Sequence, residues 1–186
     1  KPVNGNLLTS SVHILVPPVP VPAGTQYSLY LVPNDYKGDK KGHVKEYWRK
    51  WGGDKPHITL ISFQSDYNLD TMKLMATELA KSSPGKTKRW ILGKKGSVKT
   101  SGKLRLLEFK SETLFNKLHK LLVKYPNLKL KFNTNMLHLT VGQLHGKWPG
   151  VWREAEILTK IRACKDWKIV IVERKLGSVR WLNMYN

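Results

Sequence analysis

The sequence predicts an α+β protein whose single domain is built from two similar halves. Runs of strand-like and helical pattern alternate as strand, helix, strand, helix, strands, helix, strand, helix, strands. A His-x-Thr motif stands inside one strand-like run of each half, in HITLISF at 57–63 and in MLHLTVGQ at 136–143. A chain of 186 residues, 40% of them hydrophobic, can bury the core of such a domain.

The first half follows an extended, proline-bearing arm at 1–26, and 27–186 is expected to be one domain. YSLYLVP at 27–33 has the composition of a strand, which its proline closes. KGHVKEYWRKW at 41–51 predicts a short helix, because the two glycines that follow are a stop signal. Apolar residues at helical spacing predict a second helix at 69–83.

The second half begins with a basic stretch at 81–103, which holds eight Lys or Arg and no acid. We expect it to form short strands joined by basic turns. Ser111 is the expected cap of a helix over 112–125, whose apolar residues fall on one stripe and which Pro126 ends. The other expected elements are a strand at 103–109, a helix at 151–163, and strands at 167–175 and 178–185.

The charge of the chain favours a polyanionic partner. Lys and Arg total 33 against 13 Asp and Glu, a formal net charge of +20. Such an excess favours nucleic acid over the alternative of a basic surface that serves solubility or contacts anionic membranes. The basic stretch at 81–103 is then either a track for an RNA backbone, which we favour, or a solvated surface rich in turns.

The single cysteine, Cys164, cannot form an internal disulfide. We therefore expect an intracellular protein of the cytoplasm or nucleus, where thiols stay reduced. One cysteine and no paired ligand spacing give no zinc site. No apolar run approaches the length of about 20 residues that a membrane helix needs, so no membrane span is expected.

Alternation along a strand places each histidine beside its threonine. Alternate side chains share a face, so His57 points with Thr59, and His138 points with Thr140. The opposite face of both strands is apolar and is expected to lie under the helices. The His-Thr faces are thus left for a cleft, and a pseudo-twofold relation between the halves would bring all four polar side chains together.

Two imidazoles and two hydroxyls suit an in-line displacement at phosphorus. One histidine can accept a proton from the attacking oxygen while the other protonates the leaving oxygen, because histidine titrates near neutrality. Threonine hydroxyls donate hydrogen bonds to the non-bridging oxygens. The remaining histidines lack the pattern, and His119, inside the helix at 112–125, is expected to be structural.

The pair HITL and HLTV, some eighty residues apart, resembles the 2H phosphoesterase superfamily. This group includes RNA 2′,5′-ligase-like proteins, 2′,3′-cyclic nucleotide phosphodiesterases and the cyclic phosphodiesterase domains of tRNA ligases. The resemblance implies a bilobal pseudo-twofold fold, with two antiparallel-rich sheets flanking a central cleft and helices outside. It also implies metal-independent chemistry without a cofactor on RNA or nucleotides carrying a 2′,3′-cyclic phosphate, and we expect a monomer.

By this resemblance His57, Thr59, His138 and Thr140 take the catalytic and phosphate-binding positions. The likeness to the cyclic nucleotide phosphodiesterases implies His138 as base and His57 as acid, with a 2′-phosphate as product. Their first motif carries an aromatic residue five positions after the histidine, where this chain has Ser62 and then Phe63. The residues expected to bind substrate by stacking on a base are Phe63, Tyr30 and Trp148.

Two alternatives stay open at this stage. The first keeps the chemistry and changes the substrate, to 2′–5′ oligoadenylates or to RNA 3′ ends. The second is a basic RNA-binding module without turnover, whose affinity would fall steeply with salt.

Overall fold

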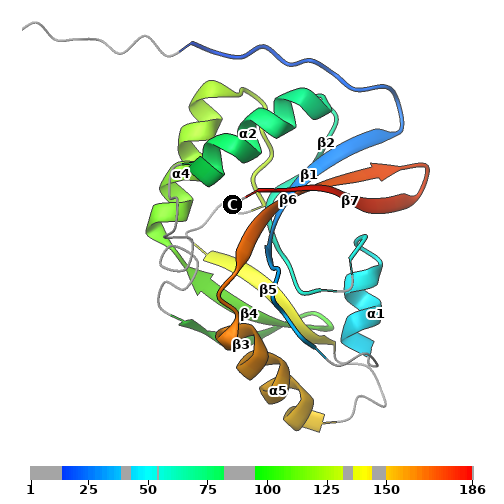
Figure 1. Ribbon diagram of the computed structural model, residues 1–186, viewed down its shortest axis with the longest axis vertical. Helices are drawn as coiled ribbons and strands as arrows, with labels where there is room; N and C mark the ends of the chain where they lie inside the picture. Colours follow the sequence, from blue (N-terminus) through cyan, green and yellow to red (C-terminus); the bar gives the residue numbers. More distant parts are fainter. Residues whose placement is uncertain are drawn as a thin grey trace, which may run out of the picture.

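The structure is a computed structural model that describes residues 14–38, 43–53, 55–81, 95–131, 136–143 and 150–185. Within these residues the chain forms seven strands and four helices (Figure 1). The strands are β1 (Thr25–Pro33), β2 (Ile58–Gln64), β3 (Lys95–Ser101), β4 (Leu104–Lys110), β5 (Met136–Gln143), β6 (Trp167–Lys175) and β7 (Ser178–Tyr185). The helices are α1 (His43–Arg49), α2 (Leu69–Lys81), α4 (Glu112–Lys124) and α5 (Gly150–Ala163).

The seven strands form one antiparallel sheet in the order β3-β4-β5-β2-β1-β6-β7. The expected α+β class is confirmed. The expectation of two sheets differs from this arrangement, because the two His-Thr strands are neighbours and are joined at the centre of a single sheet. That junction is narrow, with one register pair, Ile58 opposite Leu139. After Ile58, β2 no longer pairs with β5. Its residue Ile61 instead forms a bridge with Leu130, in the segment that precedes β5.

The apolar faces of the two central strands are buried as the alternation predicts. Ile58 and Leu60 of β2 have no exposed surface, nor do Leu139 and Val141 of β5. Helices α2 and α4 pack together over one side of the sheet, with α2 against β1 and β6, while α1 and α5 contact β5 (Figure 1). Burial of these aliphatic side chains is the main favourable contribution to folding of this core.

The opposite face of β1 and β6 carries a second, smaller cluster. Tyr30, Val32, Val170 and Val172 are buried there. The side chains packed against them are only partly buried: Trp51, Phe63, Val179 and Trp181. This face is therefore less completely covered than the helical side.

The arm lies partly within the described residues. Val16 N–H donates to the Lys124 carbonyl at 2.7 Å, and Val21 N–H donates to the Ser65 carbonyl at 3.0 Å. β1 begins at Thr25, two residues before the expected strand. The division into an arm and a body stays a prediction, and residues 1–13 lie outside the described residues.

Ser111 is the N-cap of helix α4. Ser111 has extended backbone angles, and its Oγ accepts a hydrogen bond from Leu114 N at 3.3 Å, as expected of an N-cap. Ser111→Ala should lower the free energy of unfolding by about 0.5–2 kcal/mol, measured by denaturant titration. Ser111→Asp, which keeps an acceptor, should lose much less. Equal losses in the two variants would contradict the capping role.

Candidate functional site

The strand register brings the two motifs together. Ile58 lies opposite Leu139 in an antiparallel pair, which brings the middle residues of the two motifs side by side. The histidine and threonine side chains of both motifs line a single pocket of about 320 Å³. The predicted convergence of the four residues is present in the structure.

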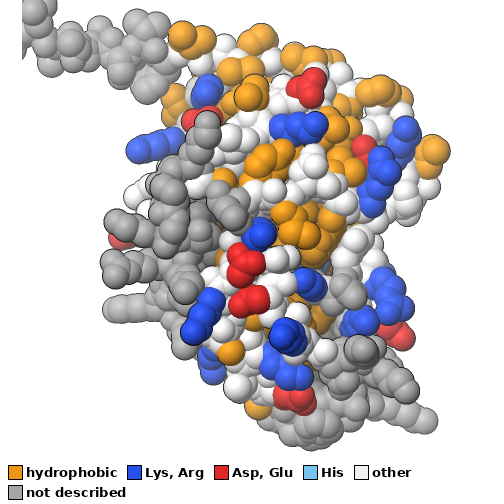
Figure 2. All heavy atoms as spheres, in the orientation of Figure 1, with side chains coloured by type: hydrophobic (Ala, Val, Ile, Leu, Met, Phe, Trp, Pro, Cys, Tyr) orange, Lys and Arg blue, Asp and Glu red, His pale blue; other side chains and the backbone are white. Residues whose placement is uncertain are grey.

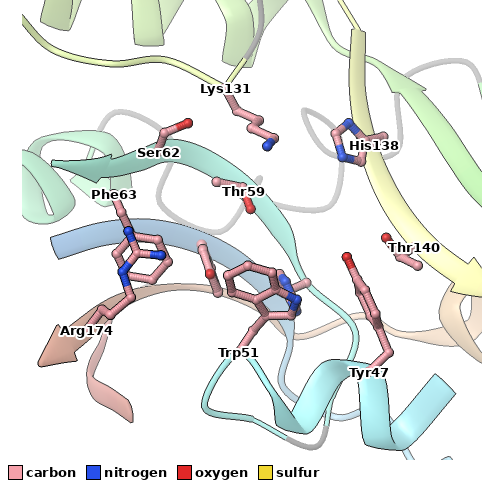
Figure 3. Close-up of a pocket in the computed structure, with 11 residues that line it drawn as sticks. Tyr47, Trp51, Thr59, Ser62, Phe63, Lys131, His138, Thr140 and Arg174 are labelled. Atoms are coloured by element: carbon pink, nitrogen blue, oxygen red, sulfur yellow. The ribbon is translucent and has the colours of Figure 1, made fainter. Parts of the chain in front are cut away.

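Other elements complete the pocket wall. Helix α1 contributes Tyr47, the turn after it Trp51, and the segment before β5 contributes Lys131. In Figure 3, Thr59, His138 and Thr140 lie around the same space as Lys131, and the Tyr47 hydroxyl points toward Thr140. Hydroxyls and a cation thus surround the two imidazoles, a set of donors that suits an anion.

His57 is held in an apolar setting by Tyr30. The two rings stack with centroids 4.4 Å apart and planes 9° from parallel. Burial lowers the pKa of His57 to about 4; the backbone of Lys55 opposes this fall, and a charge on His138 adds to it. His138 lines the same pocket. With its pKa lowered to about 4, His57 is neutral at pH 7 in the free protein.

The nitrogen of His57 that can meet a ligand is Nε2. Nδ1 has no exposed surface, and no group among the described residues faces it with ordinary hydrogen-bond geometry. Burial of the ring disfavours its protonation, which agrees with the lowered pKa.

His138 lies in a more polar setting. Its pKa is also lowered, by burial first and then by the positive charge of Lys131, while the carboxylate of Glu108 opposes the fall. Glu108 is the residue opposite His138 on the neighbouring strand β4. The neighbouring carboxylate favours the protonated form of His138, against burial and Lys131.

Thr140 is fixed by an indole from α1. Its side chain is buried, and Trp48 Nε1 donates a hydrogen bond to the Thr140 carbonyl at 3.0 Å. Trp48 is itself buried and meets Tyr36 edge to face, with centroids 5.7 Å apart. This contact attaches α1, and with it Tyr47, to the motif strand β5.

The turn after α1 is docked on β7. Trp181 Nε1 donates to the Trp51 carbonyl at 2.9 Å. Gly52 has φ +79°, and a Cβ there would lie 2.6 Å from the Val179 carbonyl oxygen. Glycine is therefore needed for this close approach. The result is that Trp51 stands at the pocket wall.

Of the three predicted stacking residues, Phe63 and Tyr30 line the pocket, and Trp148 lies outside the described residues. Tyr30 already stacks on His57, so its structural neighbour is the histidine. The guanidinium of Arg174 lies over the ring of Phe63, 4.2 Å from the ring centroid. Sequence reasoning missed Arg174, as it did Tyr47, Trp51 and Lys131.

The basic side chains are dispersed on the surface. Figure 2 shows Lys and Arg (blue) spread over the visible face rather than gathered in one patch. Most of the basic stretch proposed as an RNA track, residues 82–94, lies outside the described residues. The strand β3 at its end is described, and Lys99 there pairs with Glu108 at 2.9 Å.

Comparisons of the chain with protein-family models, with curated proteins and with solved structures found no match. Among the described residues, no helix has the length and apolar character needed to cross a membrane.

Proposed function

We propose that this protein is a 2H-type phosphodiesterase that hydrolyses 2′,3′-cyclic phosphates on RNA ends or nucleotides. The observation that carries the proposal is that the two motif strands are neighbours at Ile58 and Leu139 and that both histidines and both threonines line one pocket. Two strands that served only burial would have no reason to direct two imidazoles into the same space. A phosphate between them would meet a base on one side and an acid on the other.

The proposed step is an in-line displacement by water. The water oxygen bonds to phosphorus and gives its proton to one histidine, while the bond from phosphorus to the 3′ oxygen breaks. The other histidine protonates that oxygen, so the product is a 2′-phosphate with a free 3′-hydroxyl. Thr59 and Thr140 donate to the non-bridging oxygens, and Lys131 adds positive charge as negative charge builds up.

The pKa values favour His57 as the base and His138 as the acid, opposite to the roles that the resemblance implies. A base must be neutral before the reaction, and the pKa of His57 is lowered to about 4. An acid must be protonated, and the pKa of His138, though lowered, is supported by Glu108. The buried Nδ1 of His57 leaves Nε2 to accept the proton from water.

The deciding experiment is an assay on RNA that ends in a 2′,3′-cyclic phosphate, with a metal chelator present and products separated by chromatography. We expect conversion to the 2′-phosphate. Parallel reactions with 2′–5′ oligoadenylate and with RNA bearing a 3′-hydroxyl test the other phosphodiesterase substrates. RNA binding without any product between pH 4 and pH 9 would instead identify a binding module.

The proposal predicts an acidic optimum for kcat/KM, which reports the free protein. The rate should rise as pH passes about 4 and His57 loses its proton. It should fall as pH passes the pKa of His138, which lies below its usual 6.5. The maximum is therefore expected at acidic pH, below the neutral range expected of unperturbed histidines.

Substitution of Lys131 tests the assignment of the alkaline limb of the pH–rate profile to His138. Lys131→Met removes a charge that lowers the pKa of His138, so the alkaline limb should move to higher pH. Lys120→Met removes an exposed charge on α4 and should leave the limb in place. An optimum at pH 8 or above in the unmodified protein would contradict this assignment of protons.

A further inference from the structure

Arg174 lies at the side of the pocket away from His138 (Figure 3). It stands opposite Gln26 in the β1–β6 pairing. Its Nε donates to Gln26 Oε1 at 2.9 Å, its Nη2 donates to the same oxygen, and its guanidinium covers the ring of Phe63 at 4.2 Å. Two strands and an aromatic ring thus hold the guanidinium in one orientation, so little rotamer freedom remains to be lost on binding.

The charge of this guanidinium is not neutralised by the described part of the chain. None of the described carboxylates pairs with Arg174. The adjacent acid, Glu173, is engaged elsewhere, since it accepts from Arg180 at 2.8 Å and from the Tyr27 hydroxyl at 3.2 Å. Gln26 takes two of the five N–H donors of Arg174. The other donors and a full positive charge remain for an anion in the pocket.

Arg174 and the two motifs line different parts of the same pocket (Figure 3). Thr59 and Phe63 both line the pocket from β2 and are four residues apart in the chain. The guanidinium over Phe63 lies on the side of the pocket away from His138 (Figure 3). The pocket therefore offers a second place for negative charge, beside the one that the two motifs surround.

We infer that Arg174 binds a second phosphate of the substrate, the one on the 5′ side of the nucleoside that carries the cyclic phosphate. This inference rests on the proposed function. A 2′,3′-cyclic phosphate ends its strand, so any further phosphate of the same molecule lies on the 5′ side. Both a 5′-phosphate monoester and the phosphodiester of a longer RNA present oxygens to a guanidinium fork. The substrate class is thus a 5′-phosphorylated nucleotide or an RNA end, rather than a nucleoside cyclic phosphate.

The test compares kcat/KM for three substrates: a nucleoside 2′,3′-cyclic phosphate with a 5′-hydroxyl, the same compound with a 5′-phosphate, and a dinucleotide ending in the cyclic phosphate. In the unmodified protein the second phosphate should raise kcat/KM by about 10- to 100-fold, the effect of a charge-assisted hydrogen bond. In Arg174→Met that ratio should fall close to one. Arg174→Lys keeps the charge without the planar fork and should retain an intermediate ratio.

Arg162→Met is the matched control, because Arg162 is exposed on α5 and does not line the pocket. It should leave the ratio unchanged. A ratio near one in the unmodified protein, or a large ratio that survives in Arg174→Met, would overturn the inference while the proposed function stands. No turnover of any of the three substrates would overturn the proposed function itself. A rise with the dinucleotide alone would assign Arg174 to the phosphodiester of RNA, and a rise with both substrates to either source.

Discussion

Replacing His138 by alanine is expected to lower kcat/KM on RNA ending in a 2′,3′-cyclic phosphate by about 10²- to 10⁴-fold, the usual contribution of a positioned acid or base. His57→Ala should cost a similar factor. The two residues act on the same phosphorus, one on each side, so removing both should cost little more than removing one. Initial rates and single-turnover experiments on the three variants measure these effects.

The folded structure should survive both substitutions. His138 is half-buried at the wall of a pocket, so truncation enlarges an existing space rather than opening a cavity in the main core. His57→Ala loses the stacking on Tyr30 and also removes a buried nitrogen without a partner, and these effects oppose each other.

His119→Ala is the matched control for the loss of an imidazole. His119 is exposed on α4, where its Nδ1 lies 2.9 Å from the Phe115 carbonyl oxygen. This variant should keep the full rate and a similar unfolding midpoint. A near-normal rate in His57→Ala or His138→Ala, on every substrate tried, would remove the proposed mechanism.

The sequence alone predicted the elements well because their signals are local. Ser111 precedes the first turn of α4 and Pro126 follows its last turn, and each affects only the helix end next to it in the sequence. Alternation in the two motif strands correctly predicted which side chains face the pocket, because it depends only on strand geometry. The sharing of one pocket by His57 and His138 followed from an assumed pseudo-twofold relation, and the register Ile58 to Leu139 now gives it a concrete basis.

The rest depends on contacts that no local pattern encodes. Arg174 lies near the end of β6, a strand whose sequence is mostly apolar. Its position depends on the pairing of β1 with β6, which puts it beside Gln26 and over Phe63. Likewise, alternation tells which face a side chain occupies and not which strand is its neighbour, so a single sheet was not foreseen. The lowered pKa of His57 was not foreseen for the same reason: it comes from burial of the ring, and Tyr30, which stacks on it, belongs to another strand.

Trp48→Ala is expected to cause the largest loss of stability among the residues near the pocket, about 3–5 kcal/mol in the free energy of unfolding. The indole is 3% exposed, packs edge to face on Tyr36 and donates to the Thr140 carbonyl. Its removal leaves a large cavity and takes away a hydrogen-bond donor from the motif strand. Chemical denaturation measures the change, provided that the variant and the unmodified protein have the same m-value.

Trp48→Phe separates packing from hydrogen bonding. The smaller ring keeps most of the apolar contact but cannot donate to Thr140, so about 1–2 kcal/mol should be lost. Trp51→Ala is the control for a tryptophan of the same region whose side chain is only partly buried, and it should lose less stability than Trp48→Ala. Equal losses in these two alanine variants would show that the contact between α1 and β5 contributes little.

The activity of Trp48→Phe tests whether Trp48 also positions the pocket. Helix α1 presents Tyr47 to the pocket, and the Trp48 hydrogen bond is what attaches that helix to the strand bearing His138 and Thr140. If the attachment positions the pocket wall, kcat/KM should fall by more than the folded fraction alone predicts, measured at a temperature where the variant is fully folded. A rate that follows only the folded fraction would assign Trp48 to the core and leave the geometry of the pocket to the sheet.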